Sequence, residues 1–282
     1  MLLAHTNIDL HDAVKAARAA GKRIGFVPTM GALHQGHISL VKLAKEQTDF
    51  VVVSVFVNPK QFGEGEDFDK YPRTLALDAR LLTDHGVDVL YAPSVEEVYP
   101  KDKPVRQLTA GPIGADFEGA SRPGHFDGML TVVSRLFDLV EPDAVFFGQK
   151  DAQQVALVRQ MLKEQVTSGE RAPVKLVIGP TVRSGAGLAL SSRNKFLVEA
   201  DMPAALSLSK ALFAGAKGST RDQVLSLARA EISPEAKLEY LELVDQVSFE
   251  PTDLTDKPAT LIVAAKVGSV RLIDNVAIDR TL

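Results

Sequence analysis

Residues 50–57 read Phe50-Val51-Val52-Val53-Ser54-Val55-Phe56-Val57, a run that is nearly all apolar and rich in β-branched side chains. Strands that are buried on both faces have this composition, and they belong to parallel sheets covered by helices. Helix-like segments lie before the run, at residues 36–46, and after it, at residues 74–84. The run therefore predicts a central strand of a layered α/β domain.

Strands and helices continue to alternate on both sides of this run. The pattern predicts strands at residues 23–27, 87–91, 144–147 and 174–178, and further helices at residues 9–20, 129–139 and 153–163. We expect the first of these strands to stop at Pro28, because proline cannot donate to a central ladder. Such alternation is typical of a doubly wound parallel sheet.

The pattern changes after about residue 179. Two Ala- and Leu-rich helices are predicted at residues 201–216 and 221–231, followed by strands at residues 238–244, 260–266 and 270–273. The pair Gly268-Ser269 between the last two strands is a hairpin signal. We therefore expect a first domain at residues 1–180 and a second, smaller α+β domain at residues 181–282.

Composition excludes several classes of protein. The 282 residues carry a net charge of −4, which argues against a general nucleic-acid binder because phosphate neutralisation needs a basic surface. The chain has no cysteine, so disulfides, thiolate metal sites and thioester chemistry are excluded, and a cytoplasmic location is compatible. Neither a signal peptide nor a run of about 18 to 20 apolar residues is present, so we expect no membrane association.

Residues 28–37 read PTMGALHQGH and lie between a predicted strand and a predicted helix. Open α/β sheets bind ligands at the carboxyl ends of their strands, where this segment lies. Gly31 and Gly36 let a ligand approach the backbone, and the helix offers free N–H groups to phosphate. His34 and His37 can both point at one phosphate chain. Two surface histidines are the alternative, and a metal pair lacks a third ligand nearby.

Residues 54–62 read SVFVNPKQF and follow the buried strand. Gln61 can both donate and accept hydrogen bonds, which suits a hydroxy acid, although a solvated loop glutamine is the alternative. The acidic segment at residues 63–70 contains two glycines and few apolar side chains. We expect it to form a mobile flap.

Residues 147–154 read FGQKDAQQ and again pass from strand to turn to helix. Gly148 permits close approach, Lys150 is a cation suited to phosphate, and Asp151 is a hard oxygen ligand suited to Mg²⁺. Gln154 lies one helical turn beyond Lys150 and can face the same ligand. A Lys–Asp surface pair at a helix start is the alternative.

Two further segments combine cationic and hydrogen-bonding side chains. Residues 190–194, LSSRN, offer two hydroxyls and a guanidinium as a phosphate clamp, or form a polar linker between domains. Residues 121–126, SRPGHF, lie in a long segment with little regular structure. There Arg122 and His125 can reach a carboxylate or phosphate, or can form a structural turn.

The strings PTMGALHxGH, SxFVNPxQF, FGxKDxQQ and LSSRN occur in an order and spacing that resembles the pantothenate synthetase family. The resemblance covers essentially the whole chain and places it among the His-x-Gly-His nucleotidyltransferases. It implies a Rossmann-like domain that binds ATP and pantoate at residues 1–180 and a lid domain at residues 181–282. A cytoplasmic homodimer is implied as well.

The resemblance also implies residue roles. His37, as proton donor, is expected to be catalytic together with His34, Lys150 and Arg193. Asp151 is expected to bind Mg²⁺. Gln61 and Gln154 are expected to hold pantoate, with Gln61 beside the β-alanine site. Further substrate contacts are expected from Asn58, Arg122 and His125. ATP is expected to contact Met30, Gly31, Ala32, Leu33, His34, Gln35, Gly36, His37, Gly148, Gln149, Lys150, Asp151, Val182, Leu190, Ser191, Ser192 and Arg193. Some family members carry Met where this chain has Leu190, an apolar side chain of similar volume.

The implied reaction activates pantoate with Mg-ATP as an acyl adenylate and transfers the acyl group to the amine of β-alanine. The alternative within the enzymes is another His-x-Gly-His nucleotidyltransferase, one that releases a nucleotide conjugate. From another class, the alternative is a nucleotide sensor without catalysis. A dinucleotide oxidoreductase is excluded because the first turn lacks G-x-G-x-x-G.

Overall fold

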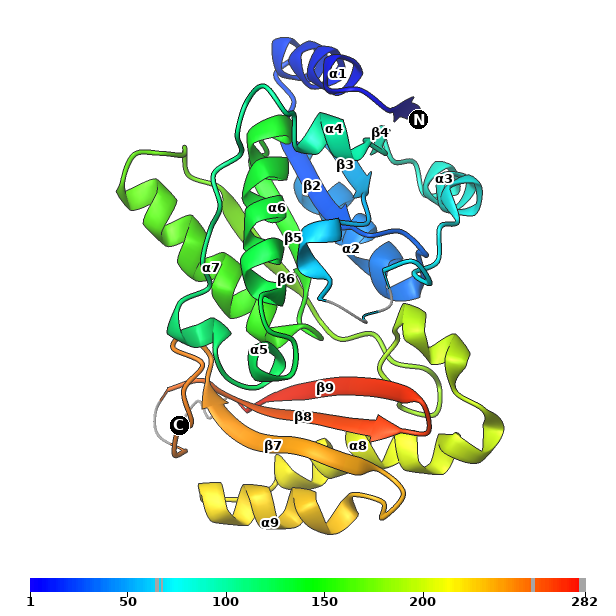
Figure 1. Ribbon diagram of the computed structural model, residues 1–282, viewed down its shortest axis with the longest axis vertical. Coiled ribbons are helices and arrows are strands. Elements are labelled where there is room, and N and C mark those ends of the chain that lie inside the picture. The colour runs from blue at the N-terminus through cyan, green and yellow to red at the C-terminus, as the bar shows by residue number, and fades with distance from the viewer. Residues whose placement is uncertain (64–65, 67, 255–256, 279–282) are drawn as a thin grey trace. The chain divides into compact units, whose positions relative to one another are not determined.

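The computed structural model describes residues 1–63, 66, 68–254 and 257–278 (Figure 1). The chain divides into two compact units, one formed by Met1–Gly148 with Leu157–Gly179, the other by Gln149–Ala156 with Pro180–Leu282. Within the described ranges, no helix is both long and apolar enough to cross a membrane. The expected flap at residues 63–70 falls partly on residues 64, 65 and 67, which lie outside the described residues.

The first unit is built on a sheet of six strands in the order β1-β4-β3-β2-β5-β6, with every neighbouring pair parallel. The apolar run at residues 50–57 supplies β3, whose Val51, Val52 and Val53 are buried. This sheet confirms the predicted doubly wound α/β fold. The strands are β1 (Leu2–Ala4), β2 (Ile24–Thr29), β3 (Phe50–Val55), β4 (Val89–Tyr91), β5 (Ala144–Gly148) and β6 (Lys175–Gly179).

Helices connect these strands and cover the sheet. Helix α2 packs on β2, β3 and β5, whereas α1 and α6 pack on each other, and Figure 1 shows α6 crossing in front of the strands. Each connection between parallel strands needs such a crossover. The helices of this part of the chain are α1 (Asn7–Ala19), α2 (Gln35–Gln47), α3 (Leu75–Asp84), α4 (Val95–Val98), α5 (Glu118–Ser121), α6 (His125–Val140) and α7 (Ala152–Thr167).

Two details of the sheet differ from the sequence predictions. Strand β2 continues through Pro28 to Thr29, so the expected stop was wrong. The Thr29 carbonyl accepts a hydrogen bond from the Phe56 N–H, so the backbone of Thr29 faces β3. The backbone of Pro28, its neighbour, faces β5, and the pairing of β2 with β5 has already ended at Phe26. The missing N–H of Pro28 therefore costs no ladder bond. The edge strand β1, only three residues long, was not predicted.

The second unit joins two helices to a three-stranded antiparallel sheet of order β7-β8-β9. Strand β8 reads ATLIVAAKV, and its continuous apolar run is buried beneath α8. The predicted hairpin at Gly268-Ser269 joins β8 and β9, but β9 extends to Ile278, beyond the expected end at residue 273. The elements are α8 (Met202–Gly215), α9 (Arg221–Glu231), β7 (Lys237–Asp245), β8 (Ala259–Val267) and β9 (Val270–Ile278).

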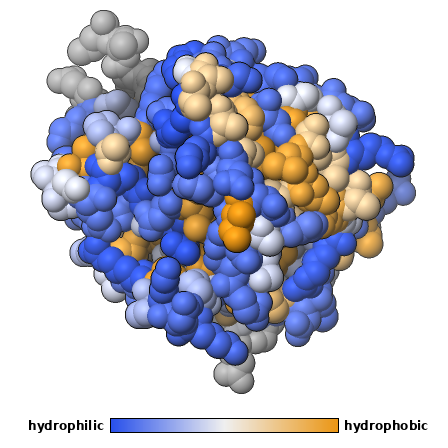
Figure 2. Space-filling view, turned by 90° about the horizontal axis from the view of Figure 1, so that it is seen from above, coloured by the Kyte–Doolittle hydropathy of each residue, from blue (hydrophilic) through white to orange (hydrophobic). Residues whose placement is uncertain are grey.

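The surface is mainly polar on the face shown in Figure 2, where hydrophobic residues form separate patches among hydrophilic ones. The apolar residues that form the cores are instead gathered inside each unit, around β2 and β3 in the first and around β8 in the second.

Candidate active site

The carboxyl ends of β2, β3 and β5 lie at one edge of the sheet, because these three parallel strands are neighbours. The strands end at Thr29, Val55 and Gly148, and each leads into one of the polar segments that the sequence singles out. Open α/β sheets bind their ligands at this edge.

His34 and His37 cap the start of α2 reciprocally. The Nδ1 atom of His34 accepts a hydrogen bond from the Gly36 N–H at 3.1 Å, and Nδ1 of His37 accepts one from the His34 N–H at 3.2 Å. The ring centroids lie 4.1 Å apart. Because each Nδ1 is an acceptor in these bonds, each neutral ring carries its proton on Nε2. The pair therefore presents two Nε2–H donors.

Two of the first N–H groups of α2, which the sequence predicted to face phosphate, already have partners within the protein. The Gly36 N–H is bound to His34, and the His37 N–H donates to the His34 carbonyl at 2.9 Å. Both backbone donors are used inside the protein. The imidazoles are further donors that this turn can offer to an anion.

Asp78 fixes the loop that precedes these histidines, although no sequence pattern pointed to it. Its buried carboxylate, 2% exposed, accepts bonds from the N–H groups of Ala32 at 3.1 Å and Leu33 at 2.9 Å. Gly31 has φ +86°, and an added Cβ would meet Val55 at 2.9 Å. Glycine is required at that position both for backbone conformation and for space.

Asn58 and Gln61 form a buried amide pair beyond β3, in and just before the 3-10 helix η1 (Pro59–Gln61). The Lys60 N–H can only donate, so the Asn58 atom that it contacts at 3.2 Å is Oδ1. Nδ2 of Asn58 then donates to the Gly128 carbonyl and to Gln61 Oε1, each at 3.1 Å. Gln61 consequently directs Nε2 away from Asn58, and this atom lies 3.1 Å from Met30 Sδ.

Tyr99 completes the environment of Asn58. Its hydroxyl donates to Asn58 Oδ1 at 2.9 Å, and burial raises the pKa of the phenol well above its ordinary value. Every polar atom of the Asn58 side chain is thus bound within the protein. Asn58 orients Gln61 by donating to its Oε1, and direct substrate contact by Asn58 stays a prediction.

Arg122 and His125 both contact the backbone carbonyl of Gln61. His125 Nδ1 is 2.8 Å from the Gln61 carbonyl and therefore donates, while Nε2 is 3.0 Å from Arg122 and therefore accepts. Arg122 also forms a two-pronged ion pair with Glu66, at 2.8 and 2.7 Å. Burial, with the charge of Arg122, lowers the pKa of His125 to about 4. These contacts are internal, and direct substrate contact by Arg122 or His125 stays a prediction.

The turn beyond β5 belongs to the second unit from Gln149 onward. Lys150 Nζ lies 3.4 Å from Asp151 Oδ1, and the Asp151 side chain is 47% exposed. Asp151 also accepts the Val155 N–H through its carbonyl at the start of α7. Gln154 is half-buried in the first turn of α7.

The segment at residues 182–193 forms a small hairpin followed by a 3-10 helix. The Leu190 N–H donates to the Val182 carbonyl at 2.9 Å, and Ser191 Oγ caps the Arg193 N–H at 3.3 Å. Thr181 Oγ1 and Asn194 Oδ1 are buried without a hydrogen-bond partner among the described residues.

No group of three or more His, Cys, Asp or Glu side chains in the described part of the chain is arranged to hold a metal ion. Mg²⁺ commonly uses one or two carboxylates together with substrate phosphates and water. The exposed carboxylate of Asp151 fits that mode of binding, since it is accessible and stands beside a lysine suited to the same phosphates.

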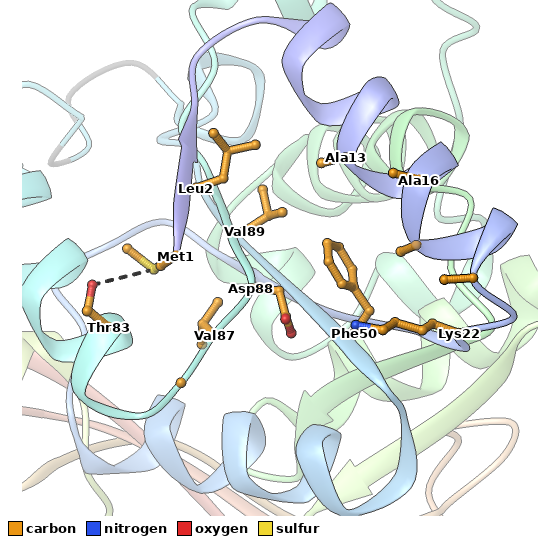
Figure 3. Close-up of a pocket in the computed structure, with 13 residues that line it drawn as sticks. Met1, Leu2, Ala13, Ala16, Lys22, Phe50, Thr83, Val87, Asp88 and Val89 are labelled. Atoms are coloured by element: carbon orange, nitrogen blue, oxygen red, sulfur yellow. Dashed lines mark hydrogen bonds between the residues drawn. The ribbon is translucent and has the colours of Figure 1, made fainter.

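Two cavities of the first unit lie away from these turns. One, of about 600 Å³, is lined by Leu2, Phe50 and Val89 among others, which begin β1, β3 and β4 (Figure 3). It lies at the amino ends of the strands, opposite Thr29 and Val55. The other, of about 400 Å³, is lined by residues that include Arg106 and Glu164. The described residues lining these two cavities include none of the predicted site residues.

Comparison with known proteins identifies the family. The sequence profile of the family described as Pantoate-beta-alanine ligase matches residues 3–277. A pantothenate synthetase from Nocardia farcinica is 49% identical over 97% of this chain and 85% of that relative. One from Aquifex aeolicus is 44% identical over 95% of both.

Solved structures agree with the sequence relatives. A pantothenate synthetase from Thermus thermophilus matches 99% of this chain and 100% of that chain, with a TM-score of 0.89 and 42% identity. A pantoate-beta-alanine ligase from Francisella tularensis, complexed with beta-gamma ATP and β-alanine, matches 98% and 97% with a TM-score of 0.77 and 36% identity. The chain therefore belongs to the pantoate–β-alanine ligase family.

Proposed function

We propose that this ATP-dependent ligase joins pantoate to β-alanine through a pantoyl adenylate. A pantoate carboxylate oxygen attacks the α-phosphorus of ATP, and the bond to the bridging oxygen breaks to release pyrophosphate. The β-alanine nitrogen then attacks the acyl carbon, AMP leaves, and the amine gives up a proton. A carboxylate needs this activation because its own oxygen is a poor leaving group.

The reciprocal capping of His34 and His37 is the observation that carries this proposal. It fixes two Nε2–H donors at the edge where the parallel strands end. We assign both to the phosphates, where they stabilise negative charge that grows as pyrophosphate leaves. In this arrangement His37 acts as a hydrogen-bond donor through Nε2.

Gln61 is proposed to bind pantoate through Nε2. An amide N–H donor suits a carboxylate or hydroxyl oxygen, and Asn58 holds the amide in the orientation that presents it. Arg122 and His125 are proposed to support Gln61 through its backbone carbonyl. Gln154 remains assigned to pantoate as a prediction from the family resemblance.

The remaining assignments concern ATP. Lys150 is proposed to neutralise phosphate charge, and Asp151 to hold Mg²⁺, which would supply Lewis-acid stabilisation of the same oxygens. Ser191, Ser192 and Arg193 are proposed as a phosphate clamp. The other residues proposed to contact ATP are those of the first turn, residues 30–37, together with Gly148, Gln149, Val182 and Leu190.

The roles of the two domains, the oligomeric state and the cellular location are also proposals. Residues 1–180 would bind ATP and pantoate while residues 181–282 act as a lid, two chains would form a homodimer, and the enzyme would work in the cytoplasm. Sedimentation analysis of the purified chain tests the second of these directly.

The function is tested by incubating the protein with ATP, pantoate and β-alanine and scoring AMP and pantothenate together. We expect the two products in equal amounts. Release of a stable nucleotide–pantoate conjugate without pantothenate would instead identify a nucleotidyltransferase. No product of either kind would identify a sensor.

A further inference from the structure

Strand β9 carries two buried polar residues that the sequence did not single out. Asp274 is 5% exposed and Asn275 is 3% exposed. Buried polar side chains need partners, and the partners of these two lie in the segments that carry Lys150 and Arg193. All the contacts described below lie within the second unit.

Asn275 binds the backbone of the Lys150 turn. Its Nδ2 donates to the carbonyl of Gln149 at 2.9 Å and to that of Lys150 at 2.8 Å. Carbonyl oxygens only accept, so both amide hydrogens are used and Oδ1 faces the Gln149 side chain, whose Nε2 lies at 3.4 Å. One side chain therefore holds two consecutive peptide units of the turn.

Asp274 binds the hairpin that leads to Ser191-Ser192-Arg193. Arg183 forms a two-pronged ion pair with the Asp274 carboxylate, at 2.5 and 2.8 Å. The same guanidinium donates to the carbonyls of Gly187 at 3.2 Å and Asn275 at 3.3 Å. The ion pair thus fastens the Arg183 arm of the hairpin to β9, and the bond to Gly187 holds the turn of the hairpin to that arm.

We propose that Asn275 and Asp274 are positioning residues for adenylate formation, and that Asn275 in particular sets the place of the Lys150 ammonium. They act through the backbone of the Lys150 turn and through Arg183, and they touch no substrate. Positioning matters because a misplacement of about 1 Å can cost roughly a hundredfold in rate. The inference rests on the proposed role of Lys150.

The test is Asn275→Asp, which keeps the shape of the side chain and replaces the donating NH₂ by an oxygen that repels the two carbonyls. We expect pyrophosphate–ATP exchange to fall by about tenfold or more, since the turn is displaced. Conversion of preformed pantoyl adenylate and β-alanine to pantothenate should change by less than about twofold, because Lys150 serves the first step. Backbone amides of residues 149–156 should exchange with deuterium faster.

Gln246→Glu is the matched control. Gln246 also donates from its amide to a buried-strand carbonyl, that of Ala259 at 3.1 Å, in the same unit but outside the segments under test. It should leave both half-reactions unchanged. If Asn275→Asp does not fold, Asn275→Ala removes the same two donors without adding charge and takes its place.

Two results would overturn the proposal: exchange within about twofold of the unchanged enzyme, or an equal loss in both half-reactions. Lys150→Ala is assayed alongside, because it tests the role of Lys150 separately from the positioning role of Asn275. Normal exchange in Lys150→Ala would remove the role of Lys150, whereas impaired exchange there with normal exchange in Asn275→Asp would remove only the role of Asn275.

Discussion

Asn58 Nδ2 lies 3.1 Å from Gln61 Oε1, and this contact decides which end of the Gln61 amide is presented. The Lys60 N–H can only donate and the Gly128 carbonyl can only accept, so together they fix the orientation of the Asn58 amide. Gly128 has no room for a side chain, because an added Cβ would meet the Lys60 carbonyl oxygen at 2.0 Å. Helix α6 can therefore approach the turn closely enough to make the bond.

Gln61→Glu should raise the KM for pantoate much more than the KM for ATP. The substitution keeps an oxygen for Asn58 but replaces the Nε2 donor by a negative oxygen, which would repel the pantoate oxygen proposed to bind there. Loss of such a partner costs about 1 to 3 kcal/mol, or roughly 5- to 150-fold. Steady-state kinetics with each substrate varied will measure both constants. An equal rise in both would point to general damage, and Gln61→Ala provides the uncharged comparison.

Two substitutions of His37 should separate the effect of its capping hydrogen bond on stability from the effect of its Nε2–H donor on adenylate formation. Glutamine at this third helical position can still accept the His34 N–H through its oxygen, as in a capping box, but its amide cannot place an N–H donor where the imidazole Nε2–H lies. We expect His37→Gln to unfold at nearly the normal temperature yet lose adenylate formation. His37→Ala should lose adenylate formation and also about 0.5 to 2 kcal/mol of stability. Near-normal adenylate formation in either folded variant would remove His37 from the mechanism.

The stability of the protein should fall as the pH is lowered from about 6.5 toward 4. His125 has a folded pKa of about 4, below its ordinary value of 6.5, so the unfolded chain binds the extra proton first. Its contribution, at most about 3 kcal/mol, is complete above pH 6.5 and is lost as the pH falls. The hydrogen bond from Arg122 holds the pKa of Glu66 below its ordinary value. The contribution of Glu66 to the stability of the protein is therefore also lost as the pH falls, at lower pH than that of His125.

Urea unfolding at several pH values checks this expectation. His125→Asn cannot titrate in this range, so its stability should change less between pH 6.5 and 4.5 than that of the unchanged protein. Glu118, which also acts on His125 electrostatically, is retained in both proteins. Parallel pH curves for the two proteins would contradict the assignment of the slope to His125.

The sheet could be predicted from the sequence because its strongest signal is local. The apolar run of β3 and the alternation around it depend on neighbouring residues, and the period of a pattern is visible without the fold. Strand β1 was missed because three residues are too few to show a period. The continuation of β2 through Pro28 was missed because it depends on which neighbour the proline faces, and this is a property of the whole sheet.

The candidate site was predictable where chemistry lies in contiguous strings. His34, Gln61 and Lys150 stand in such strings, whereas Asp78 and Asn275 act from 45 and 125 residues away in the chain. A buried carboxylate that binds two distant backbone N–H groups leaves no local signal. No pattern in the sequence indicates that His34 and His37 cap the start of α2 reciprocally.

Lys150→Ala should slow adenylate formation far more than amide formation. Its ammonium stands in a strand-to-helix turn, beside Asp151 at 3.4 Å, where phosphate charge would gather. Removal of one such electrostatic contact typically costs on the order of a hundredfold or more. Single-turnover measurement with ATP and pantoate gives the first step, and preformed pantoyl adenylate with β-alanine gives the second. Equal slowing of both would show that Lys150 does not serve the phosphates specifically.

The order of the two steps is decided by isotope exchange. If pantoate is activated as an adenylate before the amine is used, labelled pyrophosphate should enter ATP with pantoate and Mg²⁺ present and β-alanine absent. A pantoyl phosphate, formed by attack at the γ-phosphorus, would give ADP and no such exchange. The adenylate is favoured because no Walker A string occurs in the sequence, whereas the turn after β2 presents two imidazole donors at the edge where open α/β sheets bind their ligands. Absence of exchange, together with ADP rather than AMP as the product, would overturn the mechanism.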